Sequence, residues 1–300
     1  MKHIIVCLAL LLLPATLAHA DYSFVTLDNP TATTGTFPNG VAGNTYYGSY
    51  GIGVRAHGFL ATNGIFTTYD FPASTDTEIT GLSGTTSVGF FTGAGGAHGF
   101  INNNGTTTVV DYPGISSGTR VTGSSGTTLV GYYGAPKIVG FVADTGAFST
   151  LDYPGSSLTQ ANGVSGSTVV GNFDQGVAPN GFSYTRSFTY SAGVYTVFDY
   201  PGSTFTFANA IDGNTVGGYY QDASLAFHGF VRANGVFTQI DFPGAPYTEV
   251  RGIAGTTLVG YYRDASNQYH GFIATLVPEP TSLALFAAAP LLLAKRRRRS

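Results

Sequence analysis

Short segments in which apolar and polar residues alternate recur along the chain, separated by turns rich in glycine. The segments are enriched in β-branched and aromatic residues, for example TEVRGI, TTLVGYY, HGFVRA and VFTQIDF, as is typical of β-strands. Asn-Gly pairs at residues 63–64, 104–105 and 234–235 predict two-residue hairpin turns, because both turn positions accept positive φ. No stretch of residues 21–276 shows helical periodicity, so the pattern predicts an all-β fold.

A repeat of about 42 residues organises these segments. Asp-aromatic-Pro recurs at Asp70, Asp111, Asp152, Asp199 and Asp241, with a degenerate first copy at Asp28, and consecutive copies are 42, 41, 41, 47 and 42 residues apart. A second marker, x-Gly-Phe, begins at residues 57, 98, 139, 180, 228 and 270. Four strands in each repeat are typical of a β-propeller blade, so six copies predict a six-bladed β-propeller over residues 21–276.

The two ends of the repeat region complement each other. The region starts with FVTLDNP, which matches the fourth strand of a repeat, and stops after HGFIATL, which matches the third. We therefore expect the N-terminal strand to complete the last repeat and close the ring, which would remove exposed strand edges. A β-solenoid is the alternative, and it needs no such complementary ends.

The histidines of residues 21–276 occupy one equivalent position in different repeats: His57, His98, His228 and His270. Val139 and Asn180 fill the same position in the other two repeats. Zinc ligands must converge to about 2.1 Å from one ion, whereas packed sheets lie roughly 10 Å apart. We therefore expect each histidine to bond a group within its own repeat, and we predict no metal site.

The repeated aspartates Asp70, Asp111, Asp152, Asp199 and Asp241 each stand where a strand meets a turn. An aspartate there can accept hydrogen bonds from backbone N–H groups two residues further on, which predicts a scaffold role. The sequence contains no His/Asp cluster with metal-ligand spacing and no phosphate-binding glycine loop. These observations predict that the chain has no catalytic residues, needs no cofactor and is not an enzyme.

Candidate ligand-binding residues are sought where equivalent positions differ between repeats. A threonine begins each predicted innermost strand, and the residues one and three positions after it share a face because side chains alternate along a strand. If this face lines the central channel, it forms a polar pocket with aromatic platforms; if not, these are merely solvated side chains. The candidates are Phe37, Asn39, Glu78, Arg120, Gln160, Asn162, Phe207, Asn209, Glu249 and Arg251.

Residues 1–20 predict a signal peptide. Lys2 precedes an apolar run over residues 4–13, and Ala18-His19-Ala20 supplies a small-residue cleavage signal, so the mature chain is expected to begin at Asp21. The only cysteine, Cys7, lies within this segment. The mature protein is therefore expected to have no disulfide and no thiolate metal site.

The C-terminal segment, residues 277–300, contains Val277-Pro278-Glu279-Pro280, a short apolar stretch and a basic cluster. The fourteen residues 281–294 would span about 21 Å as a helix, less than the roughly 30 Å of a bilayer core, so alone they suggest a weak anchor. Together the three elements resemble the PEP-CTERM sorting signal of Gram-negative bacteria. That resemblance implies transient anchoring in the inner membrane, processing by the membrane peptidase exosortase, and a final place at the cell surface or outside the cell.

The repeats also resemble the extracellular HAF-type repeats of bacterial surface proteins, with His-Gly-Phe in place of His-Ala-Phe. Residues 21–276 carry seven basic and fifteen acidic side chains, a net charge near −8, which argues against nucleic acid as a partner. We therefore predict a surface or matrix protein that binds exopolysaccharide or a protein partner through the channel face. The resemblance to PEP-CTERM proteins, which as a class are associated with exopolysaccharide and biofilm, supports the same function.

Two alternatives remain open at this point. A polysaccharide hydrolase or lyase would normally need two carboxylates about 5 to 9.5 Å apart, and Glu78 and Glu249 are the channel candidates. A purely structural surface protein, in which the repeats provide bulk, fits the same sequence.

Overall fold

A computed structural model describes residues 21–116, 118–134, 136–177 and 183–277. Contacts divide the chain into residues 22–275 and a second unit of residues 1–21 and 276–300, of which 21, 276 and 277 are described. The expected signal peptide lies outside the described residues, as do Pro278, Glu279 and Pro280 of the expected sorting motif. No helix in the described ranges is long and apolar enough to cross a membrane.

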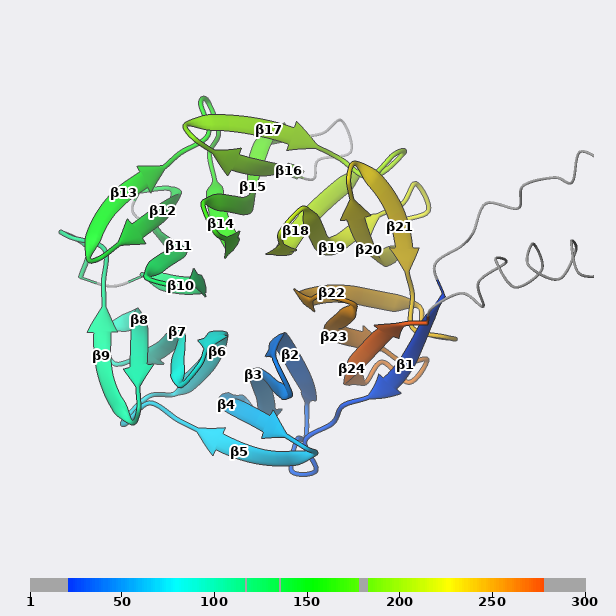
Figure 1. The fold of residues 1–300 in the computed structure, drawn as a ribbon, viewed down its shortest axis with the longest axis horizontal. Coiled ribbons are helices and arrows are strands. Elements are labelled where there is room, and N and C mark those ends of the chain that lie inside the picture. Colours follow the sequence, from blue (N-terminus) through cyan, green and yellow to red (C-terminus); the bar gives the residue numbers. More distant parts are fainter. Residues whose placement is uncertain (1–20, 117, 135, 178–182, 278–300) are drawn as a thin grey trace, which may run out of the picture. The chain divides into compact units, whose positions relative to one another are not determined.

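Residues 22–275 form sheets arranged around a central axis (Figure 1). Four sheets have four antiparallel strands each. The first comprises β2 (Gly35–Ala42), β3 (Thr45–Ile52), β4 (Arg55–Thr62) and β5 (Ile65–Tyr69), and the second β6 (Asp76–Ser83), β7 (Thr86–Gly93), β8 (Gly96–Asn103) and β9 (Thr106–Val110). The third comprises β10 (Arg120–Ser125), β11 (Thr128–Gly134), β12 (Ile138–Asp144) and β13 (Ala147–Leu151), and the fourth β14 (Thr159–Ser165), β15 (Thr168–Val177), β16 (Ser183–Ser191) and β17 (Val194–Phe198).

The fifth sheet has eight strands and contains the last two sequence repeats. Its strands are β18 (Phe205–Asp212), β19 (Thr215–Gln221), β20 (Phe227–Ala233), β21 (Val236–Ile240), β22 (Tyr247–Ala254), β23 (Thr257–Arg263), β24 (Tyr269–Leu276) and β1 (Tyr22–Thr26). A single parallel pair, Phe227 with Tyr247, joins β20 to β22. The fold is thus an all-β propeller and the β-solenoid alternative is wrong, while six separate sheets are not formed because this one backbone contact merges two of them.

The first strand in sequence pairs with the last. β1 lies beside β24 in the sheet order, and the backbone N–H of Leu27 donates to the carbonyl of Gly271 at 2.8 Å. β1 therefore takes the outermost position that the sixth repeat does not supply itself. We refer below to repeats one to six by their innermost strands β2, β6, β10, β14, β18 and β22.

A buried threonine secures the start of each innermost strand. In every repeat its Oγ1 accepts a hydrogen bond of 2.9–3.0 Å from the backbone N–H of the residue that follows the Asp of Asp-aromatic-Pro, or of Asn29 in the degenerate copy. These threonines are at most 1% exposed: Thr36, Thr77, Thr119, Thr159, Thr206 and Thr248. A buried N–H needs such a partner, so the repeated Asp-aromatic-Pro and threonine act together as a joint between repeats.

The phenylalanine of the x-Gly-Phe marker forms the core of each repeat and is fully buried: Phe59, Phe100, Phe141, Phe188, Phe230 and Phe272. The fourth member corrects the sequence-based alignment. Gly171 of β15 pairs with Phe188, as Gly131 pairs with Phe141 in repeat three, so Arg186 and not Asn180 occupies the histidine position. Asn180 itself lies outside the described residues.

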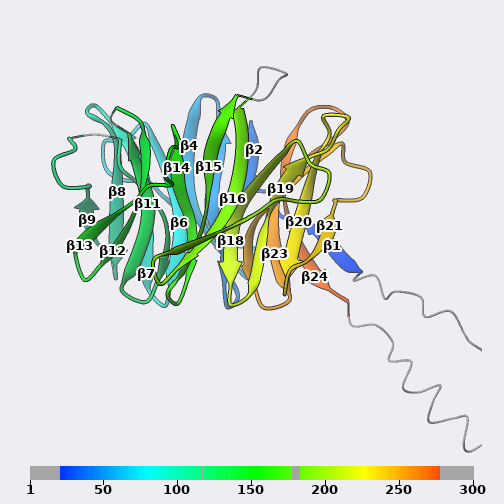
Figure 2. The same ribbon diagram turned by 90° about the horizontal axis from the view of Figure 1, so that it is seen from above.

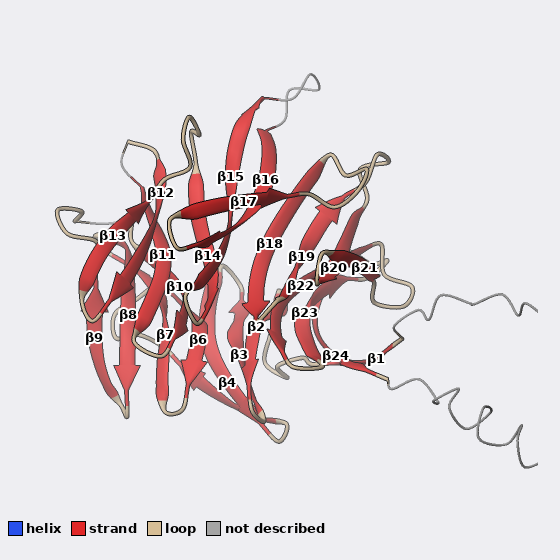
Figure 3. Ribbon diagram, turned by 45° about the horizontal axis from the view of Figure 1, so that its top comes forward, coloured by secondary structure: helices blue, strands red, loops and turns tan. Residues whose placement is uncertain are grey.

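The extra residues of repeat four therefore lie between β15 and β16, and not in the hairpin between its third and fourth strands. That hairpin is short, because Ser191 of β16 pairs directly with Val194 of β17. Strands run across the thickness of the ring (Figure 2), and β15 and β16 reach beyond their neighbours on one side (Figure 3). Residues 178–182 between them are not described.

Candidate ligand-binding site

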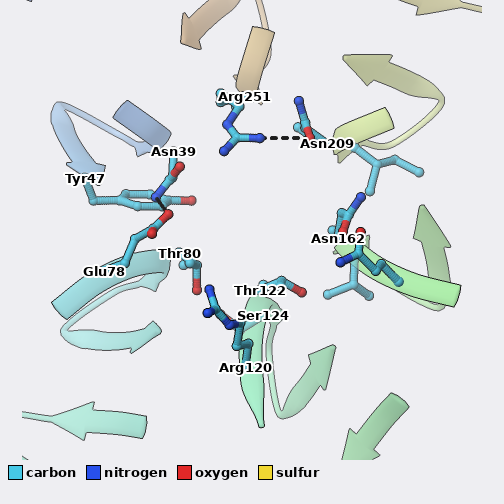
Figure 4. Close-up of a pocket in the computed structure, with 18 of the residues that line it drawn as sticks. Asn39, Tyr47, Glu78, Thr80, Arg120, Thr122, Ser124, Asn162, Asn209 and Arg251 are labelled. Carbon is cyan, nitrogen blue, oxygen red and sulfur yellow. Dashed lines mark hydrogen bonds between the residues drawn. The ribbon is translucent and has the colours of Figure 1, made fainter. Parts of the chain in front are cut away.

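A pocket of about 340 Å³ lies in the central channel, where the six innermost strands meet (Figure 4). Side chains from every repeat line it, as the sequence predicted for this face. Eight of the ten candidate residues contribute: Asn39, Glu78, Arg120, Gln160, Asn162, Phe207, Asn209 and Arg251. Thr80 and Thr122 complete the row three positions after the buried threonine.

That row coincides with a β-bulge in each innermost strand. The register between the first two strands shifts at this residue in all six repeats. A bulge leaves its residue out of the ladder and redirects the side chain. Five of these side chains donate to a backbone carbonyl of the next innermost strand, at 2.7–3.0 Å: Asn39, Thr80, Thr122, Asn162 and Asn209. These five residues therefore tie neighbouring repeats together, besides facing the pocket.

Arg251 departs from this pattern. Its Nη1 donates to Asn209 Oδ1 at 3.3 Å and lies 3.6 Å from Glu249 Oε2, and its guanidinium carbon lies 5.6 Å from the centre of the Tyr261 ring. Burial lowers the pKa of Arg251, but the tyrosine and the carboxylate outweigh this effect and raise it above its usual value. Arg251 therefore holds a fixed positive charge at the pocket wall.

Glu249 and Phe37 do not line the pocket, which corrects the sequence-based assignment. Glu249 is 2% exposed, because Tyr247 Oη donates to its Oε1 and Arg251 lies beside Oε2. Phe37 packs instead against Tyr261 and Tyr269, at ring-centre distances of 5.2 and 5.6 Å. Glu78 and Glu249 consequently do not face one shared pocket as the two-carboxylate hypothesis required.

Three aromatic residues of the second strands line the pocket and were missed from the sequence: Tyr47, Phe90 and Tyr132. Phe90 pairs in register with Glu78, and Tyr132 pairs with Arg120. Aligning the second strand against the first across the hairpin would therefore have identified both residues from the sequence. The guanidinium carbon of Arg120 lies 4.4 Å from the centre of the Phe90 ring, which is a cation–π geometry. Arg120 is thereby held at the pocket wall by its aromatic support.

Tyr47 lies over Gly40, where any side chain would collide with the tyrosine ring. Burial raises the pKa of Tyr47 to about 12, so its hydroxyl stays protonated and can donate. Glu78 Oε1 accepts a hydrogen bond from Asn39 Nδ2 at 2.9 Å. The pocket therefore offers donors and acceptors on all sides, with two arginines and one carboxylate as its charged groups.

Away from the pocket, the aspartate of each repeat pairs with a basic or histidine side chain. The pairs are His57–Asp70, His98–Asp111, Lys137–Asp152, Arg186–Asp199, His228–Asp241 and His270–Asp28, at 2.5–2.9 Å. Lys137, two positions before Val139, supplies the partner in repeat three. Within the described ranges no group of three or more His, Cys, Asp and Glu side chains is placed to hold a metal ion.

The His270–Asp28 pair also joins the two ends of the ring. Asp28 Oδ1 accepts a hydrogen bond from the Gly271 N–H at 3.1 Å, and His270 Nδ1 lies 2.7 Å from Oδ2. Burial lowers the pKa of His270, but Asp28 and then Asp264 outweigh it and raise the pKa above the usual value. A raised folded-state pKa means that this pair stabilises the fold fully below the unfolded pKa, and that the contribution is lost as pH rises through the folded pKa.

Comparison with known proteins finds similar structures but no related sequence. No protein-family model and no curated protein matches the sequence. A triple arginine-to-alanine mutant of AofleA from Arthrobotrys oligospora is similar in structure, with a TM-score of 0.51 and 12% identity over 85% of this chain and 86% of that chain. The β-propeller domain of the Trilobed protease from Pyrococcus furiosus has a TM-score of 0.47 and 9% identity over 85% and 98%. A puromycin hydrolase has a TM-score of 0.44 and 10% identity over 82% and 54%.

These likenesses correct the sequence-based prediction that the chain is not an enzyme. That prediction rested on missing catalytic motifs. The likeness to AofleA, at 12% identity, shows the fold alone, and a fold does not decide whether a protein is an enzyme. A propeller of this shape therefore gives no ground for excluding catalysis.

Proposed function

We propose that residues 21–276 act at the cell surface or outside the cell, where they bind an extracellular polysaccharide in the central pocket. We also infer that the ring counts six blades, the eight-stranded sheet comprising the fifth and sixth. In this proposal residues 1–20 direct export. The segment from Val277 to Ser300 anchors the chain transiently until exosortase processes it, as the resemblance to PEP-CTERM proteins implies.

The observation that carries the binding proposal is the contrast between neighbouring rows of the same strands. The buried threonine is the same in all six repeats, whereas the residue after it is Phe37, Glu78, Arg120, Gln160, Phe207 or Glu249. A fold that needs identical threonines at its joints does not need the residue beside them to vary among four types. Four of these six side chains line the pocket, so the variation is concentrated where a ligand would bind.

The size and chemistry of the pocket support a carbohydrate. Its volume of about 340 Å³ lies within the range of ligand sites, roughly 300 to 1,000 Å³. Amide, hydroxyl and guanidinium groups can bond sugar hydroxyls, and the rings of Phe90, Phe207 and Tyr132 supply flat apolar area. A polymer that passes over the pocket can insert one residue while its neighbours remain on the rim.

The test measures binding of the purified chain to a panel of neutral and acidic polysaccharides by isothermal titration calorimetry. Arg120→Ala is compared with Arg55→Ala, which removes an exposed arginine whose side chain donates to backbone carbonyls of Ser74 and Thr75. We expect Arg120→Ala to weaken binding about tenfold or more, and Arg55→Ala to leave it unchanged. The same mixtures are analysed for shortened oligosaccharides, which would reveal turnover.

Equal losses in both arginine variants would move the binding site away from the pocket. No binding to any polysaccharide would overturn the proposal and leave a protein partner or a structural role. Shortened oligosaccharides that disappear with Arg120→Ala would place a hydrolase or lyase activity at the same pocket.

A further inference from the structure

Repeats five and six carry aromatic residues at three equivalent positions around the channel mouth. The first position is the residue before the buried threonine. The second lies on the second strand and pairs in register with the residue that follows this threonine. The third is the residue before the histidine. We call these six residues the aromatic arc: Phe205, Tyr219, Phe227, Tyr247, Tyr261 and Tyr269. All six are half-buried.

The other repeats do without most of these rings. The position before the threonine holds Gly35 in repeat one and Asp76 in repeat two, and the position before the histidine holds Ala56 and Ala97. In repeats three and four neither position is aromatic either. Because the same fold forms with glycine, aspartate or alanine there, the scaffold does not require the aromatic arc.

The aromatic arc is continuous with the central pocket. Phe207, which lines the pocket, lies 5.3 Å from Tyr219, and Tyr219 lies 6.1 Å from Phe227, measured between ring centres. Phe227 in turn lies 5.1 Å from Tyr247 of the next repeat, and Tyr247 lies 6.2 Å from Tyr261. A polymeric ligand made of rings can therefore extend from the pocket across the fifth and sixth repeats while it stays in contact with aromatic side chains.

Positive charge accompanies the arc, although the domain as a whole is acidic. The guanidinium carbon of Arg263 lies 5.3 Å from the centre of the Tyr247 ring. In the part of the chain that the structure describes, neither Arg263 nor the pocket residue Arg120 has a carboxylate within salt-bridge distance, whereas Lys137 and Arg186 do. The neighbouring Asp264 carboxylate is engaged by its own loop, where its Oδ1 accepts a hydrogen bond from the Gln268 N–H at 2.8 Å.

The negative charge of the buried carboxylate beneath the aromatic arc is balanced by neighbouring groups. Glu249 is the acidic group beneath these rings, and it is held by Tyr247 and lies beside Arg251. Its charge therefore offsets that of Arg251. Among the described arginines of the pocket and beside the arc, Arg120 and Arg263 have no carboxylate partner within salt-bridge distance. A ligand that matches both arginines and the aromatic arc has negative charge and rings with apolar faces that can stack on aromatic side chains.

We propose that the ligand is an acidic polysaccharide with uronic acid residues. One residue enters the central pocket beside Arg120, and following sugar rings lie on the aromatic arc with a carboxylate at Arg263. This proposal rests on the proposed function and names its substrate class. Cation–π support from Phe90 and Tyr247 holds the two guanidinium groups in place before the ligand arrives.

The experiment compares hexamers of galacturonate, glucuronate and mannuronate with their neutral methyl esters, which keep the rings and remove the charge. Calorimetric titration of the full chain should give at least one acid hexamer that binds about tenfold or more tightly than its ester. That difference should shrink at 0.5 M salt because exposed charges are screened. Arg263→Gln should remove most of the preference for the acid, and Arg55→Gln should not.

The aromatic arc is tested by the double variant Phe227→Ala/Tyr269→Ala, which installs the residue that repeats one and two carry naturally. It should weaken acid and ester hexamers alike by about tenfold, because it removes ring contacts and no charge. Phe66→Ala on the outermost strand β5 is the matched aromatic control and should bind as the parent does. Circular dichroism melting verifies that each variant is folded.

The outcomes separate this inference from the proposed function. Neutral hexamers that bind as tightly as the acids would overturn the acidic ligand. An arc variant that binds like the parent, while Arg120→Ala does not, would overturn the role of the arc. Either result leaves the proposed binding site in the pocket intact. Loss of binding in Arg120→Ala, Arg263→Gln and the arc variant supports the whole proposal. Failure of every hexamer and polymer to bind overturns both.

Discussion

Replacing Thr119 by valine should destabilise the fold through one missing hydrogen bond. Thr119 is fully buried, and its Oγ1 accepts the Tyr112 N–H at 3.0 Å. Valine has nearly the same shape but no acceptor, so the N–H loses its partner. Leaving a buried donor unpaired costs about 1–3 kcal/mol, and the half-buried Tyr112 places the expected loss in the lower half, about 1–2 kcal/mol.

A domain of this size loses about 2–4 °C in Tm for each kcal/mol, so Thr119→Val should lower Tm by about 2–8 °C in differential scanning calorimetry. Thr119→Ser keeps the acceptor and loses one methyl group, which costs about 0.8 kcal/mol. Thr106→Val, on the exposed start of β9, should leave Tm within about 2 °C of the parent, because surface substitutions are usually within 0.5 kcal/mol. A Thr119→Val protein as stable as the parent would refute the joint between Asp-aromatic-Pro and the innermost strand.

Two further predictions concern the paired aspartates. Asp28→Asn should lower Tm more at pH 5.5 than at pH 8, because the raised pKa of His270 makes the pair stabilising on the acidic side, and an equal loss at both values would contradict the ring-closing role. In repeat four, the hydrogen bond and then the charge of Asp199 raise the pKa of Arg186 against the effect of burial, so this pair stays charged at any moderate pH. Arg186→His should therefore keep the parent's Tm at pH 5.5 and lose about 1 kcal/mol at pH 8, and melting curves at the two pH values check this.

Much of the fold was predictable from the repeated markers. Alternation and the turn pairs indicated strands, and the period of about 42 residues indicated a propeller. The face of the central channel was predictable too, since eight of ten candidates line the pocket. These successes share a cause, which is that strand periodicity and turn chemistry act between residues a few positions apart.

The errors lie where strand register or side-chain packing decides what surrounds a residue. The marker of repeat four was placed at Asn180 because Asn-Gly-Phe matches the spacing, whereas strand pairing places Arg186 there. The sequence predicted that Glu249 lines the channel, whereas in the structure Tyr247 and Arg251 enclose its carboxylate. Neither error could be avoided from the sequence, because pattern alone gives neither the strand register nor the side chains that pack over a carboxylate.

The sequence by itself determined the strand content, the repeat and the face of each innermost strand, because these depend on alternation and on turn residues. Tertiary structure alone decided how the ring closes at Asp28 and His270, and which candidate side chains remain open to a ligand. It also brought six aromatic residues of repeats five and six together across two neighbouring repeats. The contact between repeats five and six joins residues 20 positions apart and the ring closure joins residues 242 positions apart, where only the folded backbone determines the neighbours.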